Sequence, residues 1–343
     1  MKTRPLPTAL LTALIAGMAS PFGAQAADHV WKHTTSIAET RLEAQEFLKF
    51  VQEVEEGTNG AVDIETYFNS ALGIDPQDEL RALRDGAIEM AAPYYGYLGR
   101  DLPQLSVVVM QGALLDAGAA VAVAETLKTI FATEYEKWNV KVVGWQMGPI
   151  YDMSIFCKEP VNSFDGLAGK KLRVWSREQV LTFEKLDVPA QIMPQTELYS
   201  ALQTGVIDCA IYVVGNAKTI SIQEVSPYAA QLHVYTATPE PVAVNKAAWE
   251  ALTADQQQVV LAAGERLWER TLAAAEAEPA RREKEVAEEL TKAGSLTVLP
   301  PFSPEDKARF LAAVAEVWQS EAEAVGPEAV AYREQVMMVL QGN

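Results

Sequence analysis

One ten-residue pattern occurs twice in this chain. Residues 82–91 read ALRDGAIEMA and residues 201–210 read ALQTGVIDCA, and the two copies share five identical positions. The eighth position is an acid in both copies, Glu89 in the first and Asp208 in the second. Each copy has the composition of a helix end, a glycine able to take the left-handed conformation, and the start of a strand. The repetition therefore favours two lobes of similar design.

The segments around the two copies follow the same order of expected elements. Hydrophobic periodicity and turn residues predict three strands and two helices in each half. In the first half these are strands at 29–35, 61–68 and 87–92, with helices at 39–55 and 76–84. In the second half they are strands at 171–174, 190–193 and 206–213, with helices at 178–186 and 197–203. Alternating strands and helices predict an α/β fold with parallel strand pairing.

The last third of the chain is predicted to be helical. Residues 253–291 are rich in Ala, Glu and basic residues, which predicts one long helix or two in series with a break near Pro279. A short strand is expected at 297–299. A further helix is expected to begin with Ser303 as its N-cap and Pro304 at its first position.

The first 26 residues have the pattern of a secretory signal peptide. Lys2 and Arg4 precede an apolar run at 10–19, and Ala24-Gln25-Ala26 supplies a small-x-small cleavage site. Ten apolar residues are too few to span a bilayer, which takes about 20. We expect cleavage after Ala26 and a mature chain exported to the periplasm; the alternative is an uncleaved anchor helix.

Net charge narrows the classes of partner. The chain has 28 basic and 46 acidic residues, a formal net charge of −18. Nucleic acids and anionic membranes both require a basic surface, so neither is an expected partner. A small local basic site remains compatible with this balance.

The two cysteines, Cys157 and Cys209, both lie in the mature chain. In an oxidising compartment they can form a disulfide, or they can remain buried thiols that act as small apolar residues. From composition alone both readings stay open. Neither cysteine has a second Cys or His at metal-ligand spacing, so we expect no metal site there.

Motifs for catalysis are scarce. The three histidines show no H-E-x-x-H spacing, and the chain has no G-x-S-x-G, P-loop or G-x-G-x-x-G motif. Cys157 and His233 as nucleophile and base would lack any supporting flanking pattern. The sequence therefore favours binding over catalysis and predicts no cofactor.

A cation within an apolar strand is the strongest candidate for binding. Arg173 lies between Leu172 and Val174, at the carboxyl end of an expected strand, where ligands bind in open α/β sheets. Its planar guanidinium matches a carboxylate; the alternative is a pair with a structural acid at the sheet edge. Trp175 lies on the same side of the strand and would pack either on a ligand or in the core.

Several segments together resemble the DctP family, the extracytoplasmic solute receptors of tripartite ATP-independent periplasmic (TRAP) transporters. The most specific match is ELYSALQTGVID at residues 197–208. Further matches, in the family's order, are GAVDIETYFNSALG at 60–73, GAIEM at 86–90, DGLAGKKLRV at 165–174 and VNKAAW at 244–249. The resemblance implies a receptor that closes on a small organic anion and delivers it to a membrane permease.

The family resemblance also implies a domain organisation. It is that of a two-lobed, type II-like periplasmic binding protein with a hinge cleft and long C-terminal helices. We expect a signal peptide at 1–26, lobe 1 at 27–150 with 241–270 returning to it, and lobe 2 at 151–240. Residues 271–343 would form helices that brace both lobes. A monomer and a dimer are both compatible with this organisation.

By resemblance, Arg173 forms the salt bridge with the ligand carboxylate. Sugar-acid members of the family have a second arginine near the position of Met153 and an asparagine at the position of Tyr212. Met and Tyr would instead supply apolar and aromatic walls. We therefore expect a monocarboxylate with an apolar or aromatic body in preference to a C4-dicarboxylate or a sugar acid, although Arg177 is a possible second charge.

Residues of lobe 1 at expected strand ends are also candidates for the cleft. They are Thr34, Thr35, Tyr94 and Tyr95. In lobes of this kind, residues 155–158 would lie beside residues 208–212, which favours a disulfide between Cys157 and Cys209. Two other functions remain: an exported enzyme with an acid or base pair in the cleft, and a ligand sensor that docks on a receptor kinase.

Overall fold

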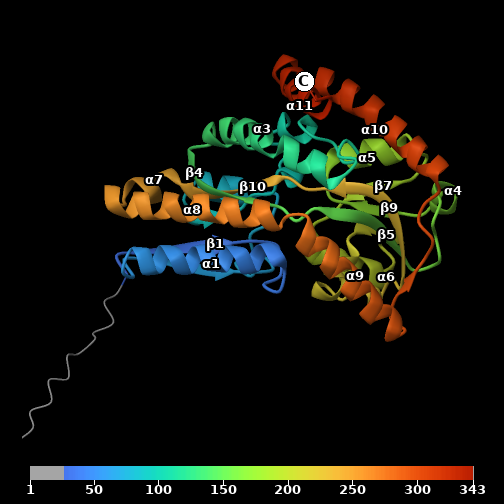
Figure 1. Ribbon diagram of the computed structural model, residues 1–343, viewed down its shortest axis with the longest axis horizontal. Coiled ribbons are helices and arrows are strands. Elements are labelled where there is room, and N and C mark those ends of the chain that lie inside the picture. Colours follow the sequence, from blue (N-terminus) through green and yellow to red (C-terminus); the bar gives the residue numbers. More distant parts are fainter. Residues whose placement is uncertain (1–26, 343) are drawn as a thin grey trace, which may run out of the picture.

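The computed structural model describes residues 27–342, which form two sheets surrounded by helices (Figure 1). The expected signal peptide and its cleavage after Ala26 lie outside the described residues. No helix among the described residues is long and apolar enough to cross a membrane.

The sheet of lobe 1 has five strands in the order β2-β1-β3-β10-β4. Its strands are β1 His29–Thr34, β2 Val62–Tyr67, β3 Met90–Ala91, β4 Val140–Met147 and β10 Pro239–Asn245. The helices of this lobe are α1 Leu42–Gly57, α2 Glu79–Arg84, α3 Ala117–Glu136, α7 Lys246–Glu250 and α8 Ala254–Ala274. Strands β1, β2 and β3 are parallel, as predicted, whereas β10 joins β3 and β4 in antiparallel pairing.

The sheet of lobe 2 has six strands in the order β11-β9-β5-β8-β6-β7. Its strands are β5 Tyr151–Cys157, β6 Leu172–Val174, β7 Ala190–Ile192, β8 Cys209–Tyr212, β9 Tyr228–Thr236 and β11 Thr297–Val298. The helices around it are α4 Phe164–Leu167, α5 Arg177–Glu184, α6 Leu198–Thr204 and α9 Ala277–Lys292. Strands β6, β7 and β8 are parallel, and β5 pairs antiparallel with β8 and β9. Helix α6 ends at Gly205, whose φ of 79° is the left-handed conformation that the repeated pattern predicts.

The chain passes between the sheets three times, at residues 148–150, 237–238 and 275–276. Hydrogen bonds join the first connection to each of the other two. The Gly148 N–H donates to the Thr238 carbonyl at 3.0 Å, and the Ile150 N–H donates to the Ala275 carbonyl at 2.8 Å. We propose that these connections form the hinge and mark the boundaries between the lobes.

The C-terminal helices contact both lobes. Helix α10 (Pro304–Val325) packs on α5 of lobe 2, and α11 (Pro327–Leu340) packs on α3 of lobe 1. Ser303 caps α10 as predicted, because its hydroxyl accepts from the Asp306 N–H. Residues 253–291 contain two helices in series, but the break falls at 275–276 and Pro279 lies in the first turn of α9, where a proline is tolerated.

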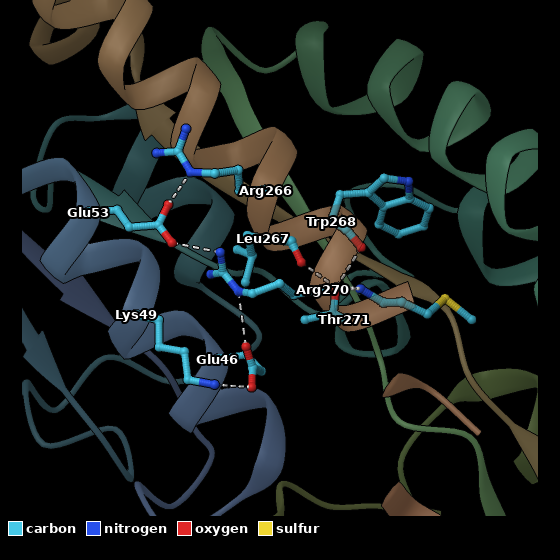
Figure 2. A network of polar contacts seen from close by, with 9 residues as sticks. Glu46, Lys49, Glu53, Arg266, Leu267, Trp268, Arg270 and Thr271 are labelled. Carbon is cyan, nitrogen blue, oxygen red and sulfur yellow. Dashed lines mark hydrogen bonds and ion pairs between the residues drawn. The ribbon is translucent and has the colours of Figure 1, made fainter. Parts of the chain in front are cut away.

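Helices α1 and α8 lie side by side in lobe 1 and are joined by ion pairs (Figure 2). The guanidinium of Arg270 contacts Glu53 at 2.6 Å and Glu46 at 3.2 Å, and Arg266 contacts Glu53 at 2.6 Å. Helix α8 also packs directly on β4. A Cβ on Gly264 would lie 2.3 Å from the Val143 carbonyl oxygen, so this close contact of helix and strand requires glycine.

Cys157 and Cys209 form a disulfide, which confirms the pairing expected from the family resemblance. They lie opposite each other in the antiparallel pair β5–β8, with their Cα atoms 4.2 Å apart. Both cysteines are buried, and the bond links two central strands of the lobe 2 sheet covalently.

Candidate functional site

A cavity of about 140 Å³ lies between the two lobes. A dry cavity of about 150 Å³ holds one benzene molecule, so this volume suits a small organic ligand. Five of the residues predicted from the sequence line it together, and they come from both lobes. They are Arg173, Trp175 and Tyr212 from lobe 2, with Thr35 and Tyr94 from lobe 1.

Arg173 is held in place by backbone carbonyls. It lies on β6 with a residue exposure of 1%, where Nε donates to the Met193 carbonyl at 2.8 Å and Nη1 donates to the Ile211 carbonyl at 3.1 Å. Ile211 lies in β8 and Met193 directly follows β7, and these are the two strands that flank β6. The sheet itself therefore orients the guanidinium. Among the described residues Arg173 has no acidic partner, which answers the alternative that it pairs with a structural acid.

The charge of Arg173 is therefore buried without an opposite charge. Burial lowers the pKa of Arg173, but a guanidinium stays protonated in proteins. A buried cation without a counter-charge is costly, and an anion in the cavity would relieve that cost. The site is thus prepared electrostatically for an anionic ligand.

Trp175 adds a second donor beside this cation. Its ring centroid lies 5.5 Å from the guanidinium carbon of Arg173, a cation–π distance. Its indole Nε1 is buried and has no partner among the described residues. Because a buried indole N–H usually has an acceptor, an oxygen of a bound ligand would complete its bonding.

The sequence analysis did not identify a second arginine that lines the cavity. Arg41 lies just before α1 and forms an ion pair with the buried Glu43. Its Nη1 also donates to Oε1 of Gln195 at 3.0 Å, and Nε2 of Gln195 donates to the Ser36 carbonyl at 2.6 Å. Gln195 belongs to lobe 2, whereas Arg41 and Ser36 belong to lobe 1, so these bonds join the two lobes across the cavity.

Glu240 of β10 also lines the cavity and was not predicted. Its Oε2 accepts from Nε2 of Gln146 at 2.8 Å. Burial, and next the negative charge of Glu43, raise the pKa of Glu240 to about 7. This carboxyl group therefore changes its charge near neutral pH.

Aromatic side chains supply much of the remaining wall. Besides Tyr94 and Tyr212, Tyr97 and Tyr151 line the cavity. Burial raises the pKa of Tyr94, Tyr97 and Tyr151, so these phenols stay neutral and can donate hydrogen bonds.

Four predicted residues do not line the cavity: Met153, Tyr95, Arg177 and Thr34. Met153 lies on β5 with its side chain fully buried in the main core, together with Ile155 and Cys157; Tyr151 is the residue of β5 that lines the cavity. Tyr95 packs against Phe131 in the same core. Arg177 is exposed and pairs with Glu321 of α10, so it does not supply a second charge.

Thr34, the other threonine considered, is fully buried and does not line the cavity, unlike its neighbour Thr35. The only local signal for Arg41 was an arginine two residues before an acid at a helix start, which is common in surface positions. No group of three His, Cys, Asp or Glu side chains within residues 27–342 is arranged to hold a metal ion.

Comparisons with known proteins agree with the two-lobed fold. The model of the DctP family, described as bacterial extracellular solute-binding protein family 7, matches residues 33–324. The C4-dicarboxylate-binding periplasmic protein DctP of Rhodobacter capsulatus is 30% identical over 342 residues, which cover 96% of this chain and 98% of that protein.

Two solved structures illustrate the shared fold. A TRAP periplasmic solute-binding protein of Sulfurospirillum deleyianum with bound succinate has a TM-score of 0.80 and 22% identity, covering 91% of this chain and 99% of that one. DctP7 of Bordetella pertussis, an extracytoplasmic solute receptor binding pyroglutamic acid, has a TM-score of 0.79 and 19% identity, again covering 91% and 99%.

Proposed function

We propose that this chain, which belongs to family 7 of the bacterial extracellular solute-binding proteins (the DctP family), is a receptor that binds a small organic carboxylate between its lobes and delivers it to a TRAP permease. The match to the family model and the relative from Rhodobacter capsulatus confirm the family resemblance predicted from the sequence, and the solved structures confirm the two-lobed α/β fold. The family is one of extracellular receptors, and the proposed receptor acts in the periplasm after cleavage behind Ala26. Its partners would be the ligand and the membrane subunits of the transporter.

The observation that carries this proposal is the buried guanidinium of Arg173, which has no acidic partner among the described residues and lines the cavity between the lobes. Two backbone carbonyls fix its orientation before any ligand arrives. Preorganised donors increase affinity because less ordering is required on binding. We assign the ligand carboxylate to Arg173, with the N–H of Trp175 as a second donor.

We further propose a monocarboxylate with an apolar or aromatic body. Tyrosine side chains and Trp175 form an aromatic wall, while the second arginine, Arg41, already has Glu43 as its counter-charge. A C4-dicarboxylate is the second candidate, because the 30%-identical relative from Rhodobacter capsulatus is named for binding that class.

The test is a thermal-shift screen of the mature protein against mono- and dicarboxylates, followed by calorimetry on each hit. A ligand at 100 times its dissociation constant stabilises the folded state by about 2.7 kcal/mol, which gives a clear shift. We expect hits from monocarboxylates that disappear in Arg173→Ala, and recovery of the ligand chemically unchanged after incubation. Turnover of the ligand would instead indicate an enzyme, and the absence of any hit among organic anions would refute the receptor.

A further inference from the structure

The charges that line the cavity are divided between its two walls. The wall from lobe 2 presents the cation Arg173. The wall from lobe 1 and its strand β10 presents Arg41 together with two carboxyl groups, Glu43 and Glu240. A ligand that fits between these walls therefore meets a positive end and an acidic end.

Arg41 does not neutralise this acidic end as a whole. Its guanidinium is engaged by Glu43 and by the amide oxygen of Gln195. One cation and one carboxylate in contact cancel each other's charge at a distance. Glu240 is thus the acid on this wall without an ion-pair partner among the described residues.

One oxygen of Glu240, which lines the cavity, has no hydrogen-bond partner among the described residues. Oε2 accepts from Gln146, whereas Oε1 accepts from no described residue, and the side chain is only partly buried. Gln146 has its own unpartnered acceptor, since its Oε1 is buried without a donor among the described residues. Glu240 and Gln146 therefore present acceptors that lack donors, whereas Trp175 beside Arg173 presents a donor that lacks an acceptor. Nε of Arg41 is the one buried side-chain donor of the lobe 1 wall that has no acceptor among the described residues.

We propose that Glu240 selects ligands that carry a hydrogen-bond donor at the end remote from their carboxylate, so that the ligand class is monocarboxylates with a distal hydroxyl, amide N–H or ammonium group. This inference rests on the proposed function, because it assumes that the ligand carboxylate lies at Arg173. A second carboxylate would instead place like charges together in a site of low dielectric constant. A distal methyl group would leave the acceptors of Glu240 and Gln146 without a partner.

Proton linkage gives this proposal a distinctive sign. The groups that act on Glu240 are Glu43 and Arg41 beside α1 and Gln146 on β4, while Tyr95 and the α3 residue Tyr135 lie within electrostatic range. The two tyrosines stay neutral because burial raises their pKa. With the pKa of Glu240 near 7, a ligand that donates to its ionised form lowers that pKa and releases a proton. Affinity for such a ligand rises between pH 6 and 8, whereas affinity for a dicarboxylate, which requires the protonated form, falls.

The experiment compares three four-carbon acids that differ only at the far end: butyrate, 4-hydroxybutyrate and succinate. Affinities are measured by calorimetry at pH 6, 7 and 8. We expect 4-hydroxybutyrate to bind about tenfold more tightly than butyrate, since a hydrogen bond to a charged group has that effect. Its affinity should increase with pH, and succinate should bind more weakly than 4-hydroxybutyrate at pH 8.

Glu240→Gln is the diagnostic variant, because it keeps the size of the side chain and removes its charge. It should abolish the pH dependence between 6 and 8, reduce the preference for the hydroxyl and increase affinity for succinate. Glu283→Gln is the matched control. Burial likewise raises the pKa of Glu283 to about 7, but Glu283 lies on α9 beside Gln231, away from this cavity. This control should preserve both the preference and the pH dependence.

The outcomes separate the two proposals. Equal binding of the three acids, tightest binding of succinate, or an unchanged pH dependence in Glu240→Gln would overturn the role of Glu240 while the receptor stands. Arg173-dependent binding of another anion, with none of the three acids bound, would also overturn it alone. If no organic anion binds, the proposed function falls and this inference falls with it.

Discussion

The two sheets of this protein share one plan and differ in what they present to the cavity. Reading from the parallel edge, lobe 1 has the order β2-β1-β3-β10-β4 and lobe 2 has β7-β6-β8-β5-β9, so five strands correspond one to one. The two repeated acids, Glu89 and Asp208, each accept a hydrogen bond from a backbone N–H of a neighbouring segment. An oxygen of Glu89 accepts the Lys32 N–H at 2.9 Å, and an oxygen of Asp208 accepts the Lys171 N–H at 2.9 Å.

The pairing registers identify equivalent residues. Ala91 and Ala210 are the last residues of the two repeated segments, and they pair with Thr34 and Arg173 respectively. Thr34 of β1 and Arg173 of β6 thus occupy equivalent positions. In lobe 1 this residue is a fully buried threonine, and in lobe 2 it is the cation that lines the cavity. The shared sheet order fixes this position in both lobes, and the side chain at it decides whether the position carries a charge.

At a second pair of equivalent positions, the two lobes differ in how neighbouring strands are held together. Met90 pairs with Val244 across β3 and β10, whereas Cys209 pairs with Cys157 across β8 and β5. Both pairs of strands are joined in the sheet, but at this position lobe 1 has apolar side chains whereas lobe 2 has a covalent bond. Four experiments test how far this comparison extends.

Removing the disulfide should have the largest effect. The cysteines are 52 residues apart, and closing a loop of that length restricts the unfolded chain by about 4 kcal/mol. We expect the double variant Cys157→Ala/Cys209→Ala to lose free energy of unfolding of about that size, measured by urea denaturation without reductant. Wild type in reductant is the control. A loss below about 1 kcal/mol in both would mean that packing holds lobe 2 as it holds lobe 1.

Giving lobe 2 the residue of lobe 1 should remove binding. Arg173→Thr should reduce affinity for the carboxylate on the order of 100-fold or more, because a buried charge pair loses one partner. The unliganded variant should be no less stable than the wild type, since a costly buried cation is gone. Arg177→Thr, an exposed arginine four residues away, should leave affinity unchanged. Retained binding in Arg173→Thr, measured by calorimetry, would contradict the assignment of the cation.

Replacing the repeated acids should affect both lobes alike. Glu89→Ala and Asp208→Ala each remove the acceptor for a backbone N–H, which we expect to cost about 1–2 kcal/mol of the free energy of unfolding. Denaturant unfolding of the two single variants measures this. If the losses in free energy of unfolding differ by more than about 1 kcal/mol, the two junctions contribute unequally to stability although their sequences are similar.

The strands and helices of the two repeated halves and their order could be predicted from the sequence because they depend on local patterns, whereas α3, β4, β9 and β10 were not predicted. The Gly205 conformation, the Ser303 cap and the parallel strands β1–β3 and β6–β8 follow from spacing and residue type within a few positions. The extent of the strands was less accurate: β3 is limited to Met90–Ala91, where a run at 87–92 was expected. The length of a ladder depends on its partner strands, and the pattern of one segment does not contain them.

The site could be predicted only in part, for the same reason. Arg173 stood out because a cation within an apolar strand is locally unusual. Arg41, Gln195 and Glu240 look ordinary in their own segments. Folding of lobe 1 brings Arg41 and Glu240 to one wall, and Gln195 reaches Arg41 from lobe 2. Met153 was placed in the cavity by counting along the chain from Arg173, whereas its position on β5 turns its side chain into the core.

The contact at Gln195 joins the two lobes, so its loss should have the smallest effect of the four but the most informative one. Gln195→Ala removes the bonds to Arg41 and to the Ser36 carbonyl without touching Arg173 or Trp175. These bonds join residues of the two lobes, so their loss should shift the population toward open forms and reduce affinity about tenfold.

The matched control is Gln191→Ala, which replaces an exposed glutamine on β7 of the same lobe. Small-angle scattering of the unliganded variant should show a larger radius of gyration than that of the control. If affinity falls while the radius stays the same, Gln195 acts on the ligand directly, and the difference between the lobes then includes a second polar contact besides Arg173.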